Sequence, residues 1–202
     1  MRTSNYIADK QGTAFFAAMR YARDLEEQPN LFVTVNFVCT DCPRGEASIV
    51  MQRLVNNHFA RWLRYESNKA KEAGGTGYPL AYVWVAEAPD NLPHTHWCVY
   101  VPPELKTAFA RKMPKWIATV AGTIRDEGCC IDITEITAIM GVARYSMKGL
   151  SARNARRRFV KPEDQGTVYG KRVAISRSLG KKARNTKKQP APVFASAMAE
   201  AA

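Results

Sequence analysis

The chain has 202 residues and a mass of 22.6 kDa, which suits one domain with at most a short appendage. Hydrophobic residues make up 46% and charged residues 24%, so the composition is globular and excludes a wholly disordered chain. No run of about 18 apolar residues is present, so we expect no membrane span. The first ten residues contain no apolar secretion signal, and the five cysteines are an odd number. We therefore expect a cytoplasmic protein without a disulfide framework.

The net charge of +12 is concentrated in one segment of the chain. Residues 1–150 contain 17 lysines and arginines against 15 acidic residues, whereas residues 151–188 contain 13 against two. Such blocks bind polyanions or are solvated tails, and nucleic acid is favoured here over a membrane surface. We expect a folded domain at 1–150, a basic extension at 151–188 and a disordered tail at 189–202.

Hydrophobic periodicity and turn residues predict alternating helices and strands. In chain order they are a helix at 13–27, a strand at 31–38, a turn at 40–45, a long helix at 46–72, a strand at 80–87, a loop at 88–93, a strand at 94–101, a helix at 104–121 that Pro114 kinks or breaks, a strand at 129–136 with Cys129 and Cys130 in the core, a helix at 138–148, and a short strand at 171–176 within a mostly irregular basic segment. The strands at 80–87 and 94–101 form a hairpin. This order predicts an α+β sandwich with helices on one face of a mainly antiparallel sheet.

Two of the three histidines, His94 and His96, lie two residues apart at the start of a predicted strand. Side chains at this spacing point to the same face, so both imidazoles can meet one cation. The alternative is a polar alternation on a half-exposed strand. Glu87 ends the preceding strand, and antiparallel pairing would place it near both imidazoles. Such a three-ligand site with open positions accepts Mn²⁺, Mg²⁺ or Zn²⁺, and Asp90 is the second choice for the carboxylate.

Tyr145 and Lys148 are three residues apart on the last predicted helix, so the phenol and the ammonium can face one site. A tyrosine can act as a covalent nucleophile when a cation or base draws off its proton. Lys148 would favour the phenolate and offset negative charge developing at phosphorus. The alternative is a surface tyrosine beside a basic run.

Together these motifs resemble the HUH endonuclease superfamily, and specifically rolling-circle replication initiators with one nucleophilic tyrosine. Three segments carry the resemblance: the strand at 31–37, the histidine motif at 93–102, and the Tyr-x-x-Lys motif at 143–149, whose tyrosine follows His96 by 49 residues. The resemblance covers roughly residues 30–150. It implies an HUH/RRM-like antiparallel sheet of about five strands with helices packed against it.

The resemblance also implies an activity. His94, His96 and Glu87 would bind Mg²⁺ or Mn²⁺, and Tyr145 would attack the scissile phosphate of single-stranded DNA at a replication origin, possibly in a hairpin. The products would be a 5′-phosphotyrosine and a free 3′-OH, with Lys148 orienting Tyr145 or balancing charge. A mobilisation relaxase or an insertion-sequence transposase of the same superfamily, or a non-catalytic nucleic-acid-binding module, stay open as alternatives.

The basic extension is expected to contact DNA phosphates, with Phe159 and Tyr169 available for base stacking. The candidate contacts are Asn36, Arg144, Arg153, Arg156, Arg157, Arg158, Lys171, Arg172 and Arg177. The glycines of the segment 166–172 do not have the spacing of a phosphate-binding ATPase loop, so unwinding would need a separate host helicase. The single Cys39-x-x-Cys42 pair is poor support for a zinc site.

Overall fold

The computed structural model describes residues 2–25 and 28–188, so the expected tail at 189–202 lies outside the described residues. The strands are β1 (Thr3–Ser4), β2 (Leu31–Asn36), β3 (Tyr82–Glu87), β4 (His94–Val99), β5 (Ile131–Glu135), β6 (Val168–Tyr169) and β7 (Val173–Ile175). The α-helices are α1 (Asp9–Arg23), α2 (Ala47–Arg53), α3 (Ala60–Glu72), α4 (Lys106–Ala121), α5 (Glu127–Cys130), α6 (Ile139–Ser146), α7 (Ala152–Arg156) and α8 (Lys181–Lys188).

Five strands form one sheet in the order β5-β2-β4-β3-β7, and every neighbouring pair is antiparallel. The predicted α+β class with an antiparallel five-stranded sheet is therefore confirmed. The connection from β2 to β3 runs through α2 and α3, and the connection from β4 to β5 runs through α4. Each connection returns the chain to the sheet beyond an intervening strand, as in a split βαβ arrangement.

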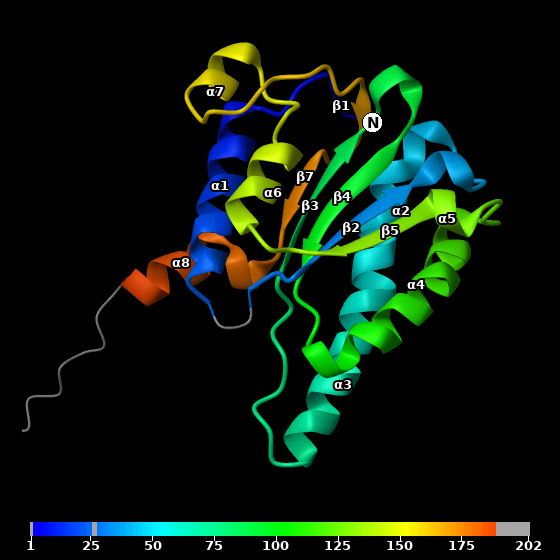
Figure 1. Cartoon of the computed structure of the whole chain (residues 1–202), viewed down its shortest axis with the longest axis vertical. Coiled ribbons are helices and arrows are strands. Elements are labelled where there is room, and N and C mark those ends of the chain that lie inside the picture. The colour runs from blue at the N-terminus through cyan, green and yellow to red at the C-terminus, as the bar shows by residue number, and fades with distance from the viewer. Residues whose placement is uncertain (1, 26–27, 189–202) are drawn as a thin grey trace, which may run out of the picture.

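Helices cover both faces of this sheet, so the expectation of one covered face is wrong (Figure 1). Alternate residues of a strand point to opposite faces, and both sets are buried here. Val33 and Val35 of β2 face the core beneath α2, α3 and α4. Val83 and Val85 of β3 face the core beneath α1 and α6. The second face also carries the even-numbered residues of β4, which include both histidines.

Several boundaries differ from the predicted ones. Helix α1 begins at Asp9 rather than at residue 13, because the Gln11 side chain accepts a hydrogen bond from the Ala8 backbone N–H and caps the first turn. Helix α4 continues through Pro114 without a break. The Asp126 side chain accepts from the Cys129 N–H, so residues 127–130 form a helical turn and β5 starts only at Ile131.

The cysteines also depart from expectation. Cys39 and Cys129 form a disulfide across 90 residues of sequence, and Cys42, Cys98 and Cys130 are free and buried. Cys129 is exposed on α5, so the prediction that it belongs to the core is wrong. Among the described residues, no helix combines the length and apolar character needed to cross a bilayer.

The second half of the basic extension belongs to the main sheet. Strand β7 pairs with β3, and the Val173 and Leu179 side chains are buried in the core beneath α1. Residue 150 is therefore not a structural boundary. The charge pattern identified this segment as basic, but it did not show that the apolar residues between the cations pack into the core.

If the extension is part of the folded unit, Leu179→Ala will lower the free energy of unfolding by about 2–5 kcal/mol, because Leu179 is completely buried. Urea titration followed by circular dichroism measures this change. Leu92→Ala, at a leucine that is 45% exposed, is the matched control and should change stability little. A cost for Leu179→Ala no larger than that of the control would show that the extension does not stabilise the fold.

Candidate active site

The hairpin of β3 and β4 brings Glu87, His94 and His96 together. In its register Glu87 lies opposite His94 and Val85 lies opposite His96, so all three side chains project from the same face. The expectation that Glu87 lies across the hairpin from both imidazoles is confirmed. The Asp90 side chain, in the connecting loop, is exposed and is not part of this group.

The three side chains converge on one carboxylate oxygen. Glu87 Oε2 lies 3.2 Å from His94 Nε2 and 3.5 Å from His96 Nε2. Their ligand atoms all lie within 4.8 Å of one another, and no other such group of His, Cys, Asp or Glu occurs in the described part of the chain. Neither Glu87 oxygen nor His96 Nε2, all buried, makes a hydrogen bond of good geometry, and the contacts of Oε2 with the two imidazoles and Lys148 are ion-pair contacts. Buried polar atoms without partners are costly, so this donor set fits a cation placed between them.

The outer nitrogen of each imidazole is held by a neighbour. His94 Nδ1 lies 3.2 Å from the Leu92 carbonyl oxygen, which can only accept, so Nδ1 carries the proton in the neutral ring. His96 Nδ1 lies 3.2 Å from Thr34 Oγ1. With its proton on Nδ1, the His94 ring presents the Nε2 lone pair to Glu87, which is the usual arrangement of a histidine that binds a metal ion. The Thr34 hydroxyl can accept a proton from His96 Nδ1 or donate one to it, so it is compatible with the same arrangement.

Electrostatics keep this site charged. Burial alone would raise the pKa of Glu87, but the contacts with His94 and His96 and the charge of Lys148 lower this pKa to about 2. Burial lowers the pKa of His96 by more than the Glu87 carboxylate raises it. At neutral pH an ionised carboxylate therefore lies beside a neutral His96 imidazole, and both groups can serve as ligands of one cation.

Helix α6 carries Tyr145 over the histidines. The Tyr145 ring packs edge-on against His96 with 5.1 Å between ring centroids, and its side chain is half exposed. Lys148, just beyond the end of α6, places Nζ 4.5 Å from the centre of the Tyr145 ring and 3.4 Å from Glu87 Oε2. The predicted convergence of phenol, ammonium and histidines is thus present in the structure.

Lys148 is held in its charged form. Burial alone would lower the pKa of Lys148, but the Glu87 carboxylate and Tyr145 raise it above its ordinary value. The ammonium consequently stabilises negative charge on either neighbour and cannot serve as a base near neutral pH.

Two residues of β2 complete the site and were not singled out from the sequence. Phe32 stacks on His96 with 5.2 Å between ring centroids and meets the edge of Tyr145 at 6.0 Å. Thr34 orients His96, as described above. The alternation Phe32, Thr34, Asn36 is visible in the sequence, but its relevance depends on the pairing of β2 with β4, which sequence periodicity does not reveal.

Arg172 requires a correction among the expected DNA contacts. Its side chain is 1% exposed and donates from Nε to Ser4 Oγ and from Nη2 to the carbonyl oxygens of Ser4 and Gly166. Burial, partly offset by the Glu87 and Asp164 carboxylates, lowers the pKa of Arg172 to about 10. The Arg172 guanidinium therefore links the N-terminal segment to the loop at 163–166. The prediction that Arg172 contacts DNA phosphate at the surface is wrong.

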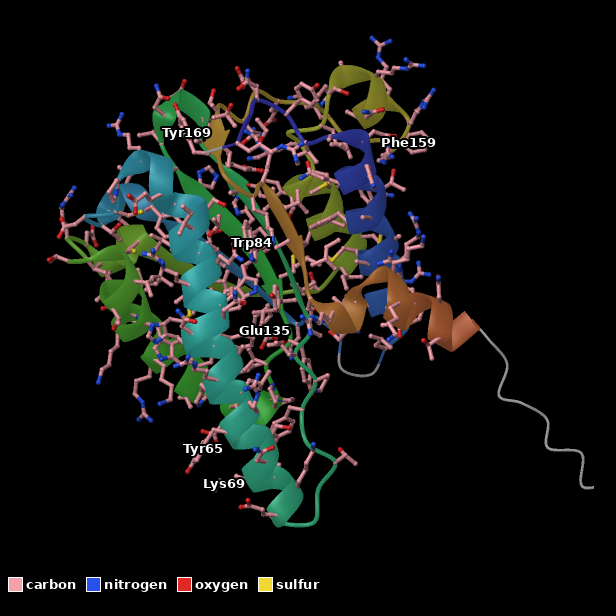
Figure 2. The ribbon with its side chains drawn as sticks, turned by 180° about the vertical axis from the view of Figure 1, so that it is seen from behind. Tyr65, Lys69, Trp84, Glu135, Phe159 and Tyr169 are labelled. Atoms are coloured by element: carbon pink, nitrogen blue, oxygen red, sulfur yellow. A yellow bond between two sulfur atoms is a disulfide. The ribbon has the colours of Figure 1, made fainter. Side chains whose placement is uncertain are left out.

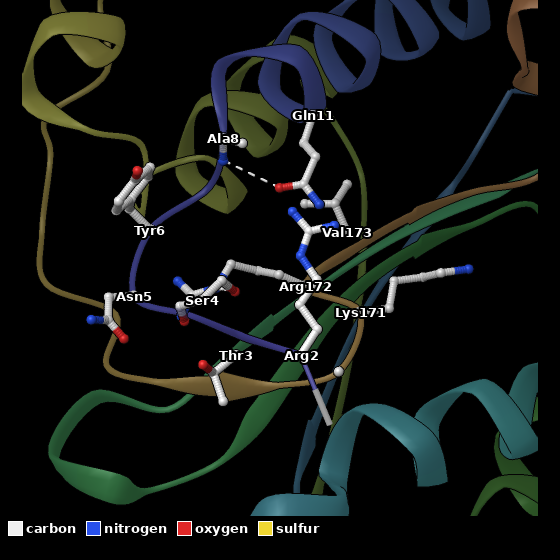
Figure 3. A pocket seen from close by; sticks show the side chains of 11 residues that line it. Arg2, Thr3, Ser4, Asn5, Tyr6, Ala8, Gln11, Lys171, Arg172 and Val173 are labelled. Carbon is white, nitrogen blue, oxygen red and sulfur yellow. Dashed lines mark hydrogen bonds between the residues drawn. The ribbon is translucent and has the colours of Figure 1, made fainter.

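Lys171 lies beside Arg172 but is exposed, at the edge of a pocket of about 590 Å³ (Figure 3). The pocket lies between the N-terminal segment and residues 170–173, and Arg2 also lines it. Its lining contains no carboxylate. The pocket therefore presents positive charge.

The other expected DNA contacts occupy different environments. Arg158 is pinned by hydrogen bonds to Asp9 and Thr13. Asn36 is half-buried, faces His94 across the sheet, and accepts from the Val38 N–H. The remaining arginines are exposed; they are Arg144, Arg153, Arg156, Arg157 and Arg177.

Comparison of the chain with models of known protein families, with curated proteins and with solved structures finds no match in any of the three.

Proposed function

We propose that this protein is a metal-dependent nicking and strand-transfer enzyme for single-stranded DNA that starts rolling-circle replication of a plasmid or phage. The observation that carries the proposal is the position of Tyr145, edge-on to His96 and beneath the Lys148 ammonium, beside a buried two-histidine, one-carboxylate group. A phenol, an ammonium and a candidate cation site therefore meet in one place, where the Tyr145 side chain is half exposed and Glu87 and His96 are buried.

Glu87, His94 and His96 would hold Mg²⁺ or Mn²⁺, which supplies Lewis-acid stabilisation of negative charge on a phosphate oxygen when bound. The chain's own residues orient the reaction. Thr34 and the Leu92 carbonyl fix the two imidazole rings, and Phe32 packs against both His96 and Tyr145. These contacts limit the rotation of Tyr145, which favours in-line attack on a phosphate placed beside it.

In the reaction the Tyr145 oxygen forms a bond to phosphorus, and the bond from phosphorus to the 3′ oxygen breaks. The phenolic proton leaves to water that reaches the half-exposed ring, and the 3′ oxygen takes a proton from solvent. Lys148 stabilises the phenolate before attack and the phosphoryl charge during it. The 5′-phosphotyrosine conserves the energy of the phosphodiester bond, so a later 3′-OH can attack it and rejoin the strand.

The exposed arginines of α6 and α7 would hold the DNA backbone, and a separate host helicase would open the duplex. A mobilisation relaxase or an insertion-sequence transposase would use the same chemistry. The Tyr-x-x-Lys spacing of Tyr145 and Lys148 favours the initiator. A non-catalytic DNA-binding module is the alternative of a different class, and the covalent test below separates it from the enzyme.

The enzyme is expected to form a covalent adduct with a single-stranded origin oligonucleotide in the presence of Mn²⁺. The adduct will migrate as a slower band on a denaturing gel and will be absent with Tyr145→Phe or with EDTA, because the nucleophile or the Lewis acid is missing. Tyr65→Phe, at an exposed tyrosine of α3, is the matched control and should retain full activity. An adduct that persists in Tyr145→Phe would exclude Tyr145 as the nucleophile.

Metal binding is expected to depend on the imidazoles. His96→Ala should weaken Mn²⁺ binding by at least tenfold in isothermal titration calorimetry, because one of three ligands is lost. His58→Ala, at a histidine outside the cluster, is the control. The His94→Ala and His96→Ala variants should still bind DNA in a salt-sensitive way, and equal loss of DNA binding would assign the pair a structural role.

Lys148→Ala is expected to slow adduct formation by about 10²- to 10³-fold while Mn²⁺ affinity stays within a few-fold, because the ammonium acts on the phenol and the phosphate rather than as a metal ligand. Single-turnover gel kinetics measure the rate. Lys148→Arg keeps the charge and should recover part of it. A rate unchanged in Lys148→Ala would remove this residue from the reaction.

A further inference from the structure

Phe159 occupies a backbone position at which glycine is normally found. Its φ of 54° lies in the left-handed region, which a bulky side chain adopts only at a cost. The Val160 N–H donates to the Ala155 carbonyl oxygen, and the Phe159 N–H donates to that of Arg156. This pair of hydrogen bonds defines a Schellman motif ending α7, with Phe159 at the position where glycine is preferred.

The Phe159 side chain does not offset this cost by packing against the rest of the fold. It is 87% exposed, the most exposed large hydrophobic side chain among the described residues. The packing of the motif comes from Ala155 and Val160, which are both buried. Figure 2 shows Phe159 at the outer end of α7, on the surface of the molecule. Folding alone would therefore favour glycine at residue 159.

The surroundings of the ring are strongly basic. Four exposed cations lie within eight residues of it, and no acidic residue occurs from 152 to 161; these cations are Arg153, Arg156, Arg157 and Lys161. Glu163 and Asp164 follow, so the segment 152–164 keeps a net positive charge. An exposed aromatic face among cations suits a single strand of nucleic acid, whose bases stack on the ring while its phosphates meet the guanidinium groups.

This lobe, residues 152–163, is anchored at the candidate active site. It begins four residues after Lys148, and its far end returns there, because the Glu163 N–H donates to the Lys148 carbonyl oxygen at 2.9 Å. Arg158 fixes the middle of the lobe to α1 through Asp9 and Thr13. The ring is thus carried by a lobe whose two ends are attached near Lys148, the residue that contacts Tyr145.

We propose that Phe159 is a base-stacking residue that holds the single-stranded substrate beside the nucleophile. The inference rests on the proposed function for its substrate, single-stranded DNA. Glycine at this position would relieve the backbone and remove the stacking surface at the same time, so stability and DNA affinity should change in opposite directions.

Phe159→Gly in the full chain is expected to raise Tm by about 2–4 °C and to weaken binding of a fluorescein-labelled 20-nucleotide single strand at least fivefold in anisotropy titrations. A strand with abasic sites in place of bases should bind both proteins equally. Phe159→Trp should retain the affinity, and Tyr65→Ala, at an exposed aromatic on α3, should change nothing (Figure 2). Arg157→Ala should weaken both strands alike, because it removes a phosphate contact.

Unchanged affinity in Phe159→Gly, or an equal loss for the abasic strand, would overturn the proposal. Loss of binding to phosphatidylserine vesicles with DNA affinity intact would assign the ring to a membrane surface and overturn it as well. The covalent assay at saturating DNA separates the two hypotheses. If Phe159→Gly forms the adduct and binds DNA with unchanged affinity, the nicking function is supported and the stacking role of Phe159 is wrong. If Phe159→Gly loses affinity and the unsubstituted chain forms no adduct, the stacking role is supported and the nicking function is wrong.

Discussion

A buried, ionised carboxylate determines how the functional face of this protein is built. An isolated carboxylate would be strongly disfavoured at the position of Glu87, which is 1% exposed, unless positive charge or a bound cation compensated it. The compensation comes from different parts of the chain. Strand β4 supplies two imidazoles, the turn after α6 supplies the Lys148 ammonium, and Arg172 adds its charge from the segment before β7. The same contacts that neutralise Glu87 therefore position Lys148, and with it the tyrosine that it covers.

The sheet separates stability from chemistry by means of its two faces. The face beneath α2, α3 and α4 is apolar, and its aromatic side chains, including Trp84, Trp97 and Phe109, fill the core. The other face combines an apolar half under α1 with a polar half under α6. Because α6 leaves Tyr145 half exposed, the proposed DNA substrate would reach the Tyr145 side chain while the Glu87 carboxylate stays out of water. The loop at 163–166 packs closely against Ala88, the residue that follows Glu87. A side chain at residue 166 would collide with the Ala88 carbonyl oxygen, so this close packing requires Gly166.

The parts of the site that the sequence predicts are those encoded by short-range patterns. The two-residue alternation of His94 and His96 and the short loop back to Glu87 lie within ten residues, so the hairpin and its three side chains follow from local rules. Phe32 and Thr34 reach His96 only through pairing across 62 or more residues, and periodicity contains no information about such partners. The same limit explains why the cover on the second face and the Cys39–Cys129 bond were not predicted. The short strand predicted at 171–176 is present as β7, but its pairing with β3 could not be derived from periodicity.

The net charge of a segment also does not predict the role of each cation in it, because it does not distinguish buried, paired and exposed side chains. In the basic extension the structure gives arginines three roles. Arg172 is buried and joins two segments, Arg158 is anchored to Asp9, and Arg153, Arg156 and Arg157 are exposed. Only exposed cations release counterions when a phosphate approaches, so the salt dependence of the proposed DNA binding would reflect a subset of the 13 cations in the segment. The buried and paired arginines act instead on the free energy of folding, because they join the N-terminal segment and α1 to the basic extension.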